Sequence, residues 1–131
     1  MTISVDTNVL VRYLTRDDEA EADRAKSLLA QGPVFVTTTV LLELVWVLTS
    51  RYGFSRDRIA HVMTLLAHND GILLENAGRV QAAVAAFAQG LDFADALHVA
   101  GSVGAETFAT FDRALVKAAP AAFDHPPVIS P

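Results

Sequence analysis

Short apolar segments alternate with stretches of helical periodicity along the chain, and this alternation limits the fold more than any other feature. The predicted strands cover residues 3–6, 34–36, 72–75 and 107–110. Strands that alternate with helices form a parallel sheet, because each crossover helix returns the chain to the same end of the sheet. The sequence therefore predicts an α/β fold with a parallel sheet and helices on both of its faces.

The helical stretches carry recognisable start and stop signals. Gly32 and Pro33 end one of them, Gly90 ends another, and acids gather at several starts. We find no internal repeat or linker, so a single domain over residues 1–131 is expected, with residues 126–129 as a possible edge strand. The expected helices are a short one beginning near Thr7, then residues 17–32, 39–52, 55–67, 79–89, 92–101 or 92–104, and 113–119.

Composition narrows the class of protein. The chain is 52% hydrophobic, which is ample for one core, yet no apolar run approaches the ~18 residues of a membrane span. The N-terminus lacks the features of a signal peptide, so we expect a cytoplasmic protein that does not contact membranes. Cysteine is absent, so any metal site must use carboxylates, histidine or water, a ligand set that suits Mg²⁺ or Mn²⁺.

The net charge of -5 argues against a broad basic surface that grips nucleic acid. It does not exclude a nuclease, because divalent cations bound among acids reverse the local charge.

Two acids in the first half of the chain have unusual positions. Asp6 ends the first strand, and ligands of parallel α/β sheets bind outside the carboxyl ends of the strands. The alternative for Asp6 is an N-cap of the following helix. Glu43 is the only charge in an otherwise apolar helix, which we expect to be buried on most faces or to lie in a subunit interface. A lone carboxylate in either place carries a desolvation cost. The alternative for Glu43 is a buried ion pair with an arginine.

Two further acids lie in the second half. Asp95 begins a helix and Asp112 ends the fourth strand, although Asp92 and Asp112 also suit N-caps and Asp95 suits a first helical turn. Acids gathered at one point repel unless cations lie between them. Two divalent ions ~4 Å apart activate a water and stabilise the leaving oxygen in phosphodiester cleavage. Convergence of Asp6, Glu43, Asp95 and Asp112 would therefore predict a metal-dependent hydrolase.

Four motifs follow one another along the chain: Asp6-Thr7-Asn8, Glu43 after a threonine-rich turn, Asp92-Phe93-Ala94-Asp95-Ala96-Leu97-His98, and Thr110-Phe111-Asp112. This order resembles the PIN-domain ribonucleases, in particular the VapC toxins of bacterial toxin-antitoxin pairs. The resemblance covers essentially the whole chain. It implies a three-layer α/β/α domain, with a short parallel sheet of four or five strands flanked by helices.

The resemblance also implies roles for individual residues and for partners. By it, Asp6, Glu43, Asp95 and Asp112 form the catalytic, metal-binding quartet, Asn8 and Thr110 are polar residues that support it, and Asp92 is an additional acid near the site. The implied activity is Mg²⁺- or Mn²⁺-dependent endonucleolytic cleavage of RNA. The implied partners are a second copy in a homodimer and a VapB-like antitoxin that inserts a segment into the active-site groove.

Other polar and aromatic residues are weaker candidates for the functional site. His98 shares a helix face with Asp95, but a packed or hydrogen-bonded histidine is the favoured interpretation. Trp46 is expected in the core or at a dimer contact. Arginines beyond the site acids fit phosphate contacts or ion pairs equally well. These arginines are Arg12, Arg16 and Arg113, and the histidines expected at the surface are His61, His68 and His125.

Two rival functions follow from the same residues. An aspartyl-phosphate phosphatase needs a second acid two residues after Asp6, where Asn8 stands, so it fits poorly. A catalytically silent protein-binding module would keep the fold without the chemistry, and metal-dependent thermal stability would separate it from an enzyme.

Overall fold

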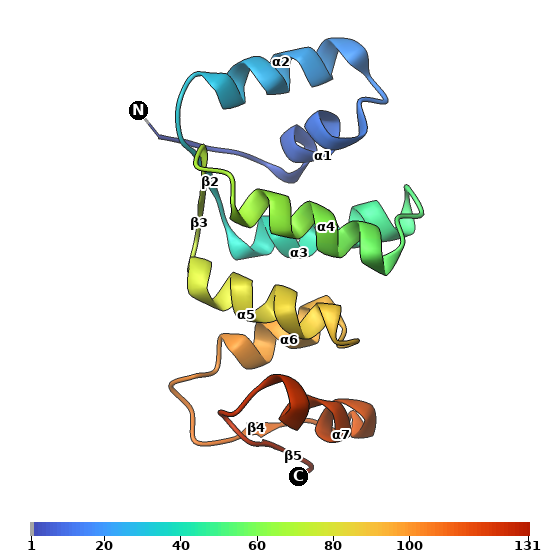
Figure 1. The fold of residues 1–131 in the computed structure, drawn as a ribbon, viewed down its shortest axis with the longest axis vertical. Coiled ribbons are helices and arrows are strands. Elements are labelled where there is room, and N and C mark those ends of the chain that lie inside the picture. The colour runs from blue at the N-terminus through green and yellow to red at the C-terminus, as the bar shows by residue number, and fades with distance from the viewer. Residues whose placement is uncertain (1) are drawn as a thin grey trace. The chain divides into compact units, whose positions relative to one another are not determined.

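The computed structural model describes residues 2–131, and the chain divides into two compact units, Met1–Ala77 and Gly78–Pro131. Each unit is described by itself (Figure 1). The first contains β1 (Ile3–Ser4), α1 (Thr7–Thr15), α2 (Glu19–Ala30), β2 (Val34–Val36), α3 (Thr38–Ser50), α4 (Arg56–Ala67) and β3 (Ile72–Leu74). From the boundary onward come α5 (Ala77–Ala88), α6 (Phe93–Ala100), β4 (Phe108–Ala109), α7 (Arg113–Ala122) and β5 (Val128–Ile129).

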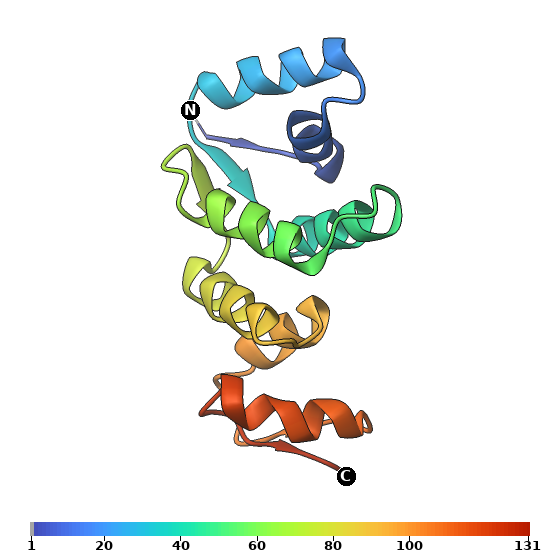
Figure 2. The ribbon, with the colours of Figure 1, turned by 45° about the vertical axis from the view of Figure 1, so that its right-hand side comes forward.

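The first unit is built on a parallel sheet with the strand order β1-β2-β3 (Figure 2). Ile3 is in register with Val34, and Val34 with Ile72. Two helices separate each strand from the next, which gives the chain room for the crossover that parallel pairing requires. The carboxyl ends of all three strands therefore lie at one edge of this sheet.

Helix α3 packs against α1 and α4 in the first unit (Figure 1). Its contact face consists of Leu41, Leu44, Val45 and Leu48, all of them buried. The opposite face is exposed, and the Trp46 side chain on it is 59% exposed. Within the chain α3 is therefore not buried on most faces, because an apolar composition does not determine how many neighbours a helix has. The alternative that its exposed face lies in a subunit interface stays a prediction.

The second unit has a smaller parallel sheet formed by β4 and β5, with α7 as the crossover. The aromatic rings of Phe87 and Phe93, whose centroids are 6.0 Å apart, join α5 to α6. The expected edge strand near the C-terminus is confirmed as β5. The described strands thus form two short parallel sheets, one in each unit, where the sequence led us to expect a single sheet.

The α/β class with a short parallel sheet flanked by helices is confirmed, consistent with a three-layer α/β/α fold. Observed helix bounds lie within a few residues of those expected, since their capping residues are visible in the sequence. Thr37 accepts a hydrogen bond from the Val40 N–H, and Ser55 accepts one from the Arg58 N–H. Within residues 2–131, no helix combines the length and apolarity needed to cross a membrane.

Candidate functional site

Asp6 lies two residues after the end of β1 and is the N-cap of α1. Its carboxylate accepts a hydrogen bond from the Thr7 N–H, and its backbone is extended, as an N-cap requires. The Asp6 side chain is exposed, whereas Thr7 is only 2% exposed. The capping alternative is therefore confirmed, and the same contact fixes the carboxylate at the carboxyl end of a sheet strand.

Glu43 lies on the exposed face of α3. An exposed carboxylate has no large desolvation cost within the chain, so the alternative of a buried ion pair was wrong. The expected penalty would arise only if this face of α3 lies in a subunit interface. The reason is the one-sided packing of α3, which places Glu43 one turn before the exposed Trp46. Glu43 is thus accessible to a ligand.

Glu75 is an acid at the carboxyl edge of the sheet that the sequence reasoning did not single out. Its Oε1 accepts hydrogen bonds of 2.9 Å from both the backbone N–H and the hydroxyl of Thr38. These bonds, the backbone one foremost, lower the pKa of Glu75 below its usual value. The signal was an acid directly after the third apolar strand, and its role is to tie β3 to the start of α3.

The second unit holds three acids that influence one another. Asp92 is the N-cap of α6, and its Oδ2 accepts a 3.1 Å hydrogen bond from the Asp95 N–H. Burial raises the pKa of Asp95 above its usual value, and the negative charges of Asp92 and Asp112 raise it further. His98 opposes the shift, so its imidazole lies near enough to act on Asp95. Asp92 and Asp112 thus each place a negative charge near the partly buried Asp95 carboxylate.

Asp112 is the N-cap of α7, with Oδ1 accepting a 3.1 Å hydrogen bond from the Leu115 N–H. The Thr110 hydroxyl accepts a 3.0 Å bond from the Asp112 N–H, and the Thr110 N–H donates to the Ile129 carbonyl at 2.9 Å. Thr110 therefore supports the segment that carries Asp112. The supporting role toward a metal site that the resemblance implies for Thr110 stays a prediction.

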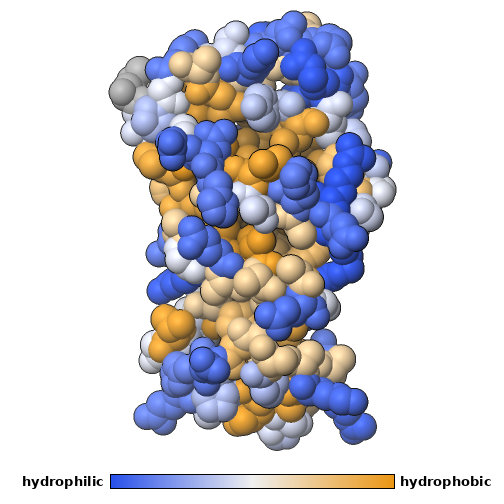
Figure 3. Space-filling model, viewed as in Figure 1, coloured by the Kyte–Doolittle hydropathy of each residue, from blue (hydrophilic) through white to orange (hydrophobic). Residues whose placement is uncertain are grey.

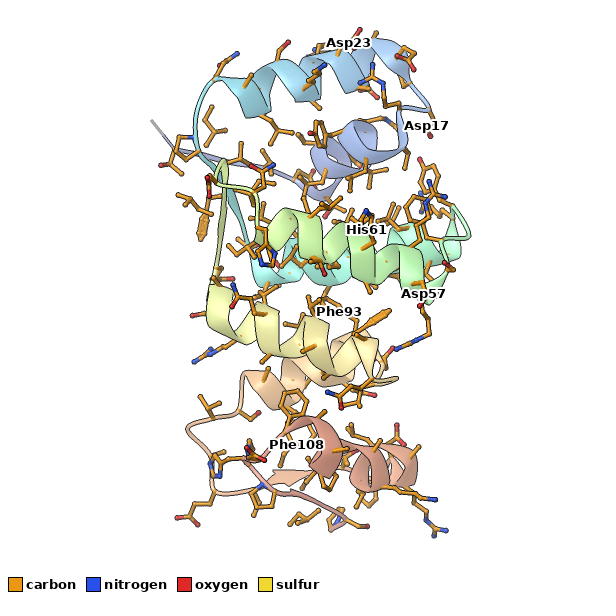
Figure 4. The ribbon with its side chains drawn as sticks, viewed as in Figure 1. Asp17, Asp23, Asp57, His61, Phe93 and Phe108 are labelled. Carbon is orange, nitrogen blue, oxygen red and sulfur yellow. The ribbon has the colours of Figure 1, made fainter. Side chains whose placement is uncertain are left out.

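The arginines that follow Asp6 in the sequence form ion pairs with acids of the α1–α2 hairpin. Arg12 bridges Asp17 and Glu21 at 3.0 and 2.8 Å, and Arg16 contacts two acids of α2. Figure 4 shows Asp17 in the turn between the two helices and Asp23 on α2. The ion-pair alternative is confirmed for Arg12 and Arg16, whereas Arg113, at the start of α7, is exposed.

The remaining predicted residues have simple locations. His61, His68 and His125 are exposed, as expected, and His98 is exposed as well. Asn8 is exposed and lines a cavity of about 610 Å³ between α1 and α2, together with Val9, Leu28 and charged residues of both helices. Figure 3 shows hydrophilic side chains covering the α2 region beside it.

The donors that this chain offers to a divalent cation are mainly the carboxylates described above. In the described residues, no group of three or more His, Asp and Glu side chains is arranged to hold a metal ion. The chemistry of the donors is nevertheless suitable, because carboxylate oxygens are the ligands that Mg²⁺ and Mn²⁺ prefer. The repulsion among Asp92, Asp95 and Asp112 is what such a cation would relieve. Asp6 and Glu43 belong to the first unit and Asp95 and Asp112 to the second, and their joint site stays a prediction.

Comparison with known families gives one match. The model of the PIN domain family matches residues 3–120, a span that includes all four acids and extends into both units. No curated protein and no solved structure matches the chain.

Proposed function

Because the chain belongs to the PIN domain family, whose members are generally nucleases, we propose that it is a Mg²⁺- or Mn²⁺-dependent endoribonuclease. The observation that carries this proposal is the family match over all four acids. Two of them lie just beyond the ends of parallel strands, Asp6 two residues after β1 and Asp112 three residues after β4, where α/β proteins place their ligands.

In this proposal Asp6, Glu43, Asp95 and Asp112 hold the metal, with Asn8, Asp92 and Thr110 supporting them. When bound, the metal supplies positive charge that lowers the pKa of the attacking water and stabilises the leaving oxygen of the phosphodiester. The caps keep the carboxylates of Asp6 and Asp112 oriented before any ligand arrives, which reduces the ordering cost of binding. Asp92 fixes the first turn of α6, which carries Asp95.

We assign the biological role by the same resemblance, as the VapC toxin of a toxin-antitoxin pair acting in the cytoplasm. The proposed acids would suit a basic side chain from a VapB-like antitoxin, because charge-assisted hydrogen bonds to carboxylates are strong. The exposed face of α3 around Trp46 supports a homodimer contact, since large apolar side chains are enriched at such interfaces.

The decisive experiment incubates a total-RNA pool with purified protein in Mg²⁺, in Mn²⁺ and in chelator, alongside Asp6→Asn. Asparagine caps a helix as well as aspartate does, so this variant should fold normally and lose the cuts. The matched control is Asp18→Asn, because Asp18 is also a helix N-cap, accepting the Glu21 N–H at the start of α2, but belongs to no predicted site. We expect discrete metal-dependent cuts by the wild type and by Asp18→Asn.

Full cleavage by Asp6→Asn would refute the quartet assignment. If the wild type makes no cut and neither metal raises its melting temperature, the chain is instead a catalytically silent binding module.

A further inference from the structure

Phe111 is the most exposed of the large apolar side chains reported for the described residues, with 87% of its surface accessible. It lies in the short segment between β4, which contains the labelled Phe108 in Figure 4, and α7. Phe87 and Phe93, in the same unit, are buried and contact each other. Phe111 therefore contributes almost nothing to the core, and its ring faces solvent.

The backbone on both sides of Phe111 is held by hydrogen bonds. On one side the Thr110 N–H donates to the Ile129 carbonyl at 2.9 Å, which joins the segment to β5. On the other side Asp112 donates its N–H to the Thr110 hydroxyl and caps α7 through Leu115. The exposed ring therefore projects from an ordered segment, and little backbone entropy would be lost when a ligand binds to it.

The neighbours of Phe111 in sequence give the surface its chemistry. Asp112 is one of the proposed metal ligands, and Arg113 is an exposed cation at the start of α7. An aromatic face, a metal-binding acid and a cation thus follow one another on one short segment. Nucleic acid offers the matching groups, since bases stack on aromatic rings and phosphates pair with arginine or with a metal.

We propose that Phe111 is a base-stacking residue that positions single-stranded RNA, with the stacked base next to the phosphate to be cleaved. This inference rests on the proposed endoribonuclease function and adds to it a residue that contacts the substrate. A base inside a duplex presents its face to its neighbours, so only an unpaired, splayed base can stack on Phe111. Arg113 contacts the backbone of the same strand.

The first test compares Phe111→Leu with Phe111→Trp in cleavage of a single-stranded RNA. Leucine keeps an apolar side chain but has no aromatic face, whereas tryptophan provides a larger one. We expect Phe111→Leu to raise KM by about tenfold to a hundredfold at nearly unchanged kcat, and Phe111→Trp to retain a KM near that of the wild type. We expect the melting temperature of Phe111→Leu to equal that of the wild type. A lower melting temperature would indicate a structural role for Phe111 instead.

The second test uses fluorescence, because Trp46 is the only tryptophan of the chain. The double variant Trp46→Phe and Phe111→Trp moves the single reporter to the proposed stacking position. In an Asp6→Asn background with Mg²⁺, unpaired RNA should quench this reporter, and the same RNA annealed to its complement should not. The matched control is Asp6→Asn with Trp46 in place, whose fluorescence should not respond.

The outcomes separate this inference from the proposed function. Cleavage by the wild type, with an unchanged KM in Phe111→Leu and no quenching at position 111, overturns the stacking role and leaves the ribonuclease intact. Quenching by unpaired RNA without cleavage in any metal supports the stacking role and overturns the enzyme. Equal quenching by paired and unpaired RNA overturns the assignment of single-stranded RNA.

Discussion

The α1–α2 hairpin of the first unit and the start of α6 in the second unit differ in how the charges of their acids are balanced. In the first unit, Arg12 and Arg16 each contact two acids of the α1–α2 hairpin, so negative charge there is balanced within the fold. In the second unit, Asp92 and Asp112 act on the partly buried Asp95 and raise its pKa. Negative charge is thus balanced by arginines in the hairpin, where it supports the fold, and unbalanced around Asp95, where a cation is proposed to bind. Local destabilisation of this kind is typical of functional sites.

The largest expected effect concerns the unbalanced acids. Asp112→Asn should lower RNA cleavage by about a hundredfold or more, because the metal stabilises the reacting groups by several kcal/mol. The melting temperature should stay near that of the wild type, since asparagine can still accept the Leu115 N–H. Asp112→Ala should lose activity and also lower the melting temperature. If Asp112→Asn keeps full activity, Asp112 does not bind the metal.

Buried apolar side chains should contribute far more to the stability of the first unit than its ion pairs do. Leu44→Ala removes a fully buried side chain of α3 and should cost about 2–5 kcal/mol in the free energy of unfolding. Leu65→Ala is the matched control, because Leu65 is 56% exposed and its truncation should cost less than about 0.5 kcal/mol. Urea denaturation of both variants measures the difference, and equal losses would contradict the assigned packing of α3.

Removing one acid from each unit tests the comparison directly, because the two substitutions should shift the melting temperature in opposite directions. Asp17→Asn should lower the melting temperature in chelator, since Asp17 accepts hydrogen bonds from Tyr52, Thr15 and Arg12. Asp95→Asn should raise it, since the change removes a carboxylate that burial and two neighbouring acids disfavour. Added Mn²⁺ should stabilise the wild type and leave Asp95→Asn nearly unchanged. Shifts of the same sign in chelator would refute the contrast.

The smallest effect concerns pH. The pKa of Glu75 is lowered in the folded state, so its contribution is complete above the ordinary glutamate pKa and is lost as pH falls through the folded value. The melting temperature should therefore fall below about pH 5, and Glu75→Gln should reduce that fall. Glu106→Gln, at an exposed position before β4, is the control and should follow the wild type. Identical pH profiles for all three proteins would contradict the role of Glu75.

The α/β class and most helix bounds could be predicted from the sequence, because capping and hydrophobic periodicity are local signals. Thr37, Ser55, Asp92 and Asp112 each stand where a helix begins, and each caps it in the structure. The position of Asp6 after a strand was equally visible. Such features depend on a few neighbouring residues, so one sequence is enough to predict them.

Features that depend on tertiary partners could not be predicted in the same way. The exposure of Glu43 follows from which helices contact α3, and the composition of α3 does not contain that information. Glu75 was missed because its partner, Thr38, lies 37 positions away in the chain. The division of the strands between two sheets has the same origin, since strand pairing is a long-range contact.

The capping aspartates also bear on how such a chain could evolve. At Asp6, Asp92 and Asp112 the carboxylate that is proposed to act in the site also satisfies a backbone N–H at the start of a helix. Replacing one carboxylate oxygen with an amide nitrogen keeps the cap and abolishes the charge. Lineages of this fold can therefore lose catalysis by single substitutions that selection on folding does not oppose.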